Sequence, residues 1–262
     1  MSATKGKKKR EVTSYCDWMS QLPPELHNIP LFNLAIPGSH DSMSYDLDIN
    51  SCIIEPDLLR RFSKIYCARK TVRRWALTQE ETITKQLDAG VRYFDLRIAR
   101  KRNETDPTRL YFYHGLYTHT DVEDTPTLKK CWDQGRNIIV SYDWQAKRPL
   151  EIWTEIIYYY GNSMDPTKVE SNLRQQLEKG RPSRHFFVCG LNLTLPGDAK
   201  ILKYVLRLCD NLPNVIRRSL PRLLRWVKEQ AGRTPMNIVA SDLATRGDFV
   251  SAVVELNISK RV

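Results

Sequence analysis

Short apolar runs that end in polar residues recur along the chain. Six of them have the length and composition of buried strands, and they cover residues 32–36, 92–98, 110–113, 137–142, 186–191 and 237–241. Between them lie stretches that we interpret as helices, among them 78–89, 166–179 and 249–257. Strands that alternate with helices are typical of a mainly parallel α/β domain.

Several residues predict where the helices begin and end. Thr78, followed three residues later by Glu81, fits a capping box, and Gly90 predicts the end of that helix. Residues 201–230 supply further helical sequence, in which we expect breaks at Pro213 and Pro221.

Chemically active side chains lie at the ends or on the faces of four predicted strands. His40 and Asp41 follow the first strand after Pro37-Gly38, and a second strand ends at His114. Asp95 and Arg97 lie two apart and would face the same side of their strand. Asp242 follows the last strand. A single His-Asp pair is more often a turn with a capping Asp, but groups from several strand ends are typical of a (β/α) barrel active site.

This set of side chains suits cleavage of a phosphodiester without a metal. Two histidines can act as general base and general acid near neutral pH. Asp41 and Asp242 are candidates for the carboxylates that orient them, and Arg97 offers a fork that fits phosphate oxygens. A metal site is the main alternative, yet no HxH or HxxxH spacing and no acidic cluster accompanies the histidines. We therefore expect no metal and no cofactor.

The composition indicates the general class of protein. A chain of 262 residues with 41% hydrophobic and 27% charged residues fits one soluble domain, which we place at 15–262. Residues 1–14 predict a basic disordered tail, whose cations could meet anionic lipid, a nuclear import receptor or RNA, or could simply be solvated. We find neither a signal peptide nor a transmembrane run, and the six cysteines have no metal-like spacing. Free thiols and a cytoplasmic location are expected.

Four motifs together resemble the phosphatidylinositol-specific phospholipase C X-domain family. They are IPGSHDS, VRYFDLRIA, YHG and NIVASD, in this order. DWMSQLP, TQEETITKQLDAG and LPRLLRWVKEQ strengthen the resemblance to the small members that consist of the X domain alone. The resemblance implies a distorted TIM-type barrel that cleaves an inositol phospholipid into diacylglycerol and a phosphorylated inositol.

The resemblance also implies a role for each site residue. His40 resembles the base that acts on the inositol 2-hydroxyl, with Asp242 orienting it, and His114 resembles the acid supported by Asp41. Arg97 stands where calcium-dependent relatives have a carboxylate, and Asp41 where they have an asparagine, so calcium independence is expected. Lys147 and Arg148 are further candidates for contacts with the substrate phosphates. The expected partner is a phospholipid at a membrane surface, met by a monomer.

One departure from the family concerns the chain after residue 124. There, roughly 50 residues, or one and a half βα units, are missing by comparison with the family. Six predicted strands are also too few for a closed eight-stranded barrel, so we expect a barrel short of one or two strands. A catalytically impaired phosphoinositide-binding or regulatory protein is therefore the alternative. A nucleic-acid-binding role would rest on the net charge of +11 alone.

Overall fold

Five parallel strands form the central sheet of the protein, seen here in a computed structural model. Described are residues 14–101, 104–106, 109–122, 156–182, 184–197, 199–206, 210–230, 233–234 and 236–258. The strand order is β2-β1-β8-β7-β6. The strands cover Tyr93–Phe94 (β2), Ile36–Ser39 (β1), Ile238–Ser241 (β8), Phe187–Gly190 (β7) and Ile157–Tyr160 (β6). The expected mainly parallel α/β class is confirmed.

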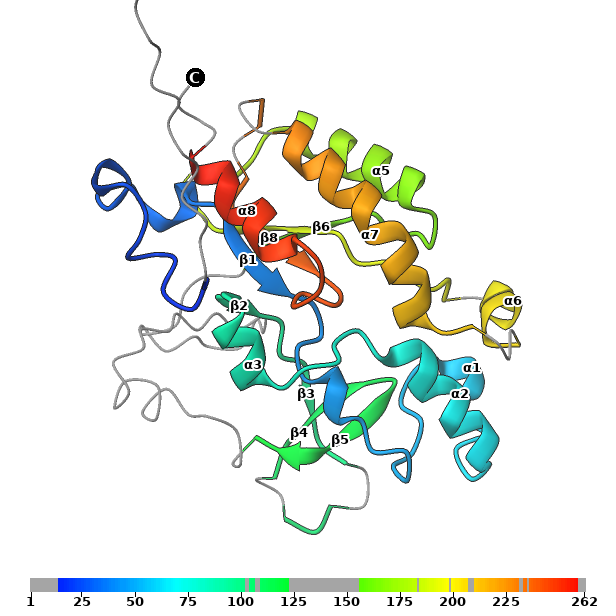
Figure 1. The fold of residues 1–262 in the computed structure, drawn as a ribbon. Coiled ribbons are helices and arrows are strands. Elements are labelled where there is room, and N and C mark those ends of the chain that lie inside the picture. Colours follow the sequence, from blue (N-terminus) through cyan, green and yellow to red (C-terminus); the bar gives the residue numbers. More distant parts are fainter. Residues whose placement is uncertain are drawn as a thin grey trace, which may run out of the picture.

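Three helices lie side by side along this sheet (Figure 1). They are α5 (Pro166–Glu178), α7 (Leu212–Glu229) and α8 (Phe249–Ile258). The three inner strands β1, β8 and β7 are buried along their whole length, and Phe187, Val239 and Phe249 are fully shielded from solvent. Burial on both faces is what a parallel sheet with helices packed against it requires, and it explains the apolar strands of the sequence.

A second, antiparallel sheet carries the other histidine. Its order is β3-β4-β5, with β3 at Ile98–Ala99, β4 at Tyr111–His114 and β5 at Leu116–Asp121. Gly115 has a φ of +71° and makes the turn between β4 and β5, a conformation that glycine adopts without strain. β5 was not predicted, because its alternating Thr and His residues show no apolar run.

Short helices fill the connections on this side of the molecule (Figure 1). They are α1 (Asp57–Arg60), α2 (Tyr66–Ala76), α3 (Ile83–Asp88) and α6 (Leu202–Val205). Single 3-10 turns are η1 (Pro24–Leu26), η2 (Leu31–Asn33), η3 (Ser44–Asp46) and η4 (Ala199–Ile201).

Two strand predictions were wrong in their bounds. The first strand was expected over 32–36, but β1 runs from Ile36 through Pro37-Gly38 to Ser39. Proline fits here because its carbonyl still accepts a hydrogen bond from the Arg92 N–H at 2.8 Å. The expected strand 92–98 divides into β2 and β3, which belong to different sheets, and Asp95 and Arg97 lie in the bend between them.

Two helix predictions also need correction. α3 begins at Ile83, and Thr82 rather than Thr78 caps it, because the Thr78 hydroxyl donates instead to the carbonyls of His40 and Asp41. Pro221 lies inside α7 without ending it. The buried leucines on both sides of it, Leu220 and Leu223, supply packing energy that outweighs the roughly 3 kcal/mol cost of an internal proline. The helices expected at 166–179 and 249–257 are confirmed as α5 and α8.

The parallel sheet is open within the described part of the chain. Its outer strands there are β2 and β6, so the described strands do not close into a ring. The strand expected over 137–142 and the tail before residue 14 lie outside the described residues. No described helix has the length and apolar character needed to cross a membrane. The four described cysteines, Cys16, Cys52, Cys67 and Cys189, are free thiols, as predicted.

Candidate active site

The candidate residues meet at the carboxyl end of the parallel sheet. His40 directly follows β1 and Asp242 directly follows β8, and these two strands are neighbours in the sheet. Asp95 directly follows β2, which flanks β1 on its other side. Parallel strands end at the same edge of a sheet, so three loops deliver polar side chains to one place.

His40 is hydrogen-bonded to Asp242. The distance from His40 Nδ1 to Asp242 Oδ1 is 2.7 Å, and the two residues are 6% and 1% exposed. The second oxygen of Asp242 accepts a hydrogen bond from the Leu193 N–H at 3.3 Å. Because a carboxylate can only accept, His40 carries a proton on Nδ1, and its Nε2 faces the other site residues.

Asp41 lies between the two histidines. One of its oxygens, Oδ2, is 3.1 Å from His40 Nε2 and 3.2 Å from His114 Nε2, and Oδ1 is 2.8 Å from Arg97 Nε. These are ion pairs without full hydrogen-bond geometry. Asp41 has a φ of +42°, in the left-handed region that aspartate tolerates better than most residues.

His114 is the last residue of β4 and approaches from the antiparallel sheet. Its Nδ1 lies 2.6 Å from the carbonyl oxygen of Ala76, and a carbonyl can only accept, so Nδ1 carries a proton. Its Nε2 points to Asp41. The rings of His40 and His114 are 6.1 Å apart, centroid to centroid, and inclined by 76°. Two imidazoles thus face a shared space with their Nε2 atoms.

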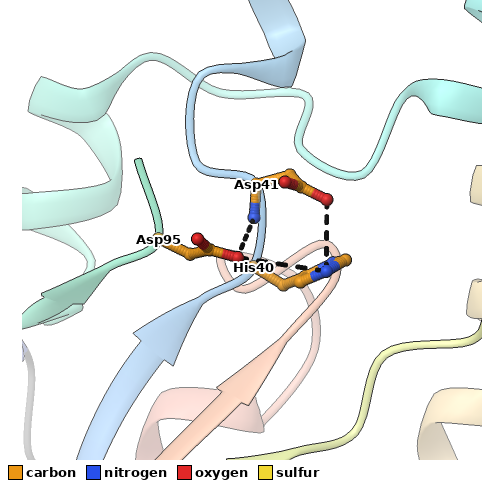
Figure 2. Close-up of side chains that lie close together, drawn as sticks. All are labelled: His40, Asp41 and Asp95. Carbon is orange, nitrogen blue, oxygen red and sulfur yellow. Dashed lines mark hydrogen bonds and ion pairs between the residues drawn. The ribbon is translucent and has the colours of Figure 1, made fainter. Parts of the chain in front are cut away.

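Arg97 and Asp95 complete the group. Arg97 Nη2 is 3.3 Å from Asp95 Oδ2 and 3.1 Å from His40 Nε2. Figure 2 shows Asp95 beside His40 and Asp41, and its carboxylate also accepts the Asp41 N–H at 3.3 Å. The sequence paired Asp95 with Arg97 but did not place it in the site. The signal was present, since Asp95 follows an apolar strand just as His40 and Asp242 do.

Electrostatics within the group shift two pKa values in opposite directions. Burial by itself would lower the pKa of His40, but the negative charges of Asp41 and Asp242 outweigh it and raise that pKa from 6.5 to about 9. Burial works against ionisation of Asp41, yet His114, His40 and Arg97 together hold its pKa below the ordinary value. Asp41 is therefore an anion at neutral pH.

Three of these side chains could in principle share a metal ion. Ligand atoms of His40, Asp41 and Asp95 lie within 4.8 Å of one another, the one such group among the described residues. The Arg97 guanidinium also contacts both carboxylates, so its fixed positive charge offsets theirs.

Tyr158 of β6 was not foreseen as a site residue. Its ring lies 6.3 Å from that of His40, and its hydroxyl donates to Asn192 Oδ1 at 3.2 Å. Burial holds its pKa well above the ordinary value, so it remains a neutral phenol. In the sequence Tyr158 opens a run of three tyrosines that ends at Tyr160, and nothing in that run indicates a site residue. Lys147 and Arg148, the predicted phosphate contacts, lie outside the described residues.

Solved structures of bacterial phospholipases share this fold. A phosphatidylinositol-specific phospholipase C of Staphylococcus aureus has a TM-score of 0.58 at 18% identity, covering 93% of this chain and 98% of that one. The phosphatidylinositol-specific phospholipase C of Listeria monocytogenes has a TM-score of 0.57 at 16% identity, with the same coverage. The expected fold of this phospholipase kind is thereby confirmed.

Relatives with higher identity were found among curated proteins, although no family profile matches the chain. PI-PLC X domain-containing protein 1 is 34% identical in both zebrafish and human, covering 92% of this chain and 95% and 92% of those proteins. PI-PLC X domain-containing protein 3 of zebrafish is 30% identical over 98% of this chain and 97% of that one.

The alignments also show a length difference. The first zebrafish alignment spans 303 positions, whereas 92% of the 262 residues of this chain is only about 240. On the order of 60 aligned positions therefore have no counterpart here, as the comparison of motifs predicted. Identity at this level over nearly the whole of both proteins decides the relationship: the chain belongs to the family of PI-PLC X domain-containing proteins.

Proposed function

We propose that this protein is a phosphodiesterase that cleaves the glycerophosphate bond of phosphatidylinositol-type lipids. The observation that carries the proposal is the placement of Asp41 between two histidines, with its Oδ2 3.1 Å from one Nε2 and 3.2 Å from the other. A general base and a general acid must reach opposite sides of the same phosphorus, and two imidazoles that face a shared space can do this.

His40 is the proposed base. Its Nε2 removes the proton from a hydroxyl of the inositol headgroup, which the family resemblance assigns to the 2-position, and the freed oxygen attacks the phosphorus. The new positive charge on the imidazole is balanced by Asp242 at 2.7 Å. Asp242 also holds the ring so that Nε2, not Nδ1, faces the substrate.

His114 is the proposed acid. As the bond from phosphorus to the glycerol oxygen breaks, the Nε2 proton of His114 passes to that oxygen, and diacylglycerol leaves. The bond from Nδ1 to the Ala76 carbonyl keeps the other ring proton in place. Asp41, with its Oδ2 3.2 Å from His114 Nε2, is the proposed supporting carboxylate. The phosphate remains on the inositol as a cyclic diester.

Arg97 is the proposed phosphate clamp and makes calcium unnecessary. Its guanidinium can stabilise the charge that builds on the non-bridging phosphate oxygens. Since it already neutralises Asp41 and Asp95, we expect turnover to continue unchanged when a chelator of divalent cations is added. Loss of turnover in the chelator, restored by added calcium, would contradict this mechanism.

Release of inositol phosphate from phosphatidylinositol vesicles tests the proposal. We expect activity in the unmodified chain and a loss of at least about 10³-fold in both His40→Ala and His114→Ala. His119→Ala is the matched control, because His119 has a 61% exposed side chain and only a distant ion pair of 3.8 Å with Asp48. If the control loses as much activity as the other two, the assignment of base and acid is wrong.

The missing aligned positions favour one alternative. A catalytically impaired protein that still binds phosphoinositides would keep the site residues but turn nothing over. Binding of the unmodified chain to phosphatidylinositol vesicles without any release of inositol phosphate would support this alternative over the enzyme.

A further inference from the structure

A buried glutamine lies directly behind the proposed active site and touches no part of the shared space between the histidines. Gln79, in the connection between α2 and α3, is 1% exposed. Its Nε2 donates to the carbonyl oxygen of His40 at 2.9 Å and to that of Ser241 at 2.9 Å. Its Oε1 accepts the N–H of Ala244 at 3.0 Å. One side chain thus ties together the loops of His40 and Asp242, which are 202 residues apart in the sequence.

These two loops carry the catalytic His-Asp pair. The first contains His40, and the second contains Asp242 between the bonded residues Ser241 and Ala244. The hydrogen bond from His40 Nδ1 to Asp242 has a length of 2.7 Å, so a shift of either loop by a fraction of an ångström would lengthen it.

The chain around Gln79 makes further bonds to the same loops. The neighbouring Thr78 hydroxyl donates to the carbonyls of His40 and Asp41, and the Thr78 carbonyl accepts the Leu243 N–H at 2.7 Å. These bonds hold Asp41 in its left-handed conformation and fix the backbone after β8. They explain why Thr78 is not available to cap α3.

We propose that Gln79 is a positioning residue, whose amide sets the distance between His40 and Asp242 by joining the loops after β1 and β8. The inference rests on the proposed function for its effect on turnover, but the His40–Asp242 bond can be measured without any turnover. Misplacement of a catalytic group by about 1 Å is sufficient for a 10²-fold loss of rate.

A matched control lies at the opposite end of β8. Asn237 is also a fully buried amide with three bonds between segments: Nδ2 donates to the carbonyls of Leu31 and Leu34 at 3.1 and 2.8 Å, and Oδ1 accepts the Phe187 N–H at 3.2 Å. Gln79→Met and Asn237→Leu each remove three bonds from a buried position, so comparable losses of melting temperature are expected. Gln79→Glu and Asn237→Asp are a more severe pair: the acceptor oxygen is kept, but a second carboxylate oxygen replaces the amide nitrogen that faces two carbonyls.

The His40–Asp242 bond can be measured by proton NMR, because a histidine Nδ1–H that is bound to a carboxylate gives a signal far downfield. The signal is assigned to His40 if it is absent from the spectrum of Asp242→Asn. In the Gln79 variants we expect this signal to disappear or move upfield and kcat to fall about 10- to 100-fold with little change in KM. In the Asn237 variants the signal and kcat stay as in the parent chain. If the parent chain shows the signal but turns nothing over, and the Gln79 variants lose the signal, the positioning role stands and the proposed function is refuted. A Gln79 variant that keeps both signal and kcat, or an Asn237 variant that loses them equally, would overturn the inference.

Discussion

At the scale of single residues, the site is governed by three carboxylates and one guanidinium around His40. Asp242 binds Nδ1, whereas Asp41 and Asp95 lie on the Nε2 side with Arg97 between them. Arg97 offsets the charges of the two carboxylates that it contacts, whereas Asp242 is paired with His40 itself. The pH dependence of the reaction should therefore depend strongly on Asp242.

Replacement of Asp242 by asparagine should move the acid limb of the pH profile. The base must be unprotonated to act, and the pKa of His40 is about 9 in the free protein. The kcat/KM of the parent chain is therefore expected to rise with pH to well above 6.5. Asp242→Asn removes one of the charges that favour the imidazolium, so the limb should shift to lower pH while the maximum rate falls about 10³-fold.

Stability provides a second measurement of the same variant. A histidine whose pKa is raised on folding stabilises the native state fully below pH 6.5, and this contribution disappears as pH rises through about 9. The free energy of unfolding of Asp242→Asn should thus decline less between pH 6.5 and 9 than that of the parent. Asp48→Asn, beside the exposed His119, serves as the control. An acid limb that stays in place in Asp242→Asn would show that His40 is not the titrating base.

At the scale of elements, the sequence predicted which polar residues follow the strands better than it predicted the first and last residue of each strand. Polar residues after apolar runs located His114 and Asp242, because β4 and β8 end where their apolar runs stop. His40 was located by the Pro37-Gly38 pair after the first run, although β1 continues past that run to Ser39. The course of β1 through Pro37-Gly38 could not be predicted, since it depends on partners from other strands. Gln79 gave no signal either, because its bonds go to loops distant in the sequence.

A substitution at Gly38 tests whether β1 is packed as closely between its two neighbouring strands as described. A Cβ at this position would lie 2.8 Å from Tyr93 Cδ1 and 3.2 Å from Ile238 Cγ2, so the side chains of both neighbouring strands would have to shift. Gly38→Ala should lower the free energy of unfolding by about 1–3 kcal/mol, as measured by urea denaturation. Gly197→Ala is the control, because nothing lies within 4 Å of its added Cβ. Equal stability of the two variants would mean that β1 does not run between β2 and β8 as described.

At the scale of the whole molecule, the assembled site contrasts with the shortened alignment. The five proposed catalytic residues come from both sheets, so their geometry depends on how β4 is held against β1 and β8. His114 reaches the site from the antiparallel sheet and is tied to the Ala76 carbonyl at the end of α2. This bond anchors His114 independently of any strand that would close the barrel, which favours retention of the site in the shorter chain.

Restoring the missing segment tests whether the bond between His114 and the Ala76 carbonyl is enough to position His114 in the site. A chain that carries the corresponding segment of the zebrafish relative after residue 124 should unfold at a higher urea concentration, because a strand added to an open sheet edge pairs backbone groups that are otherwise left to solvent. If the bond of His114 to Ala76 is sufficient, kcat for phosphatidylinositol should rise less than about tenfold. Asn237→Leu serves as the control in both backgrounds: it removes buried bonds at the opposite end of β8 from the site, so a fall in kcat there would reflect loss of folded protein. Turnover confined to the restored chain, at a temperature where both chains are folded, would contradict this account and show that closure of the barrel is what places His114.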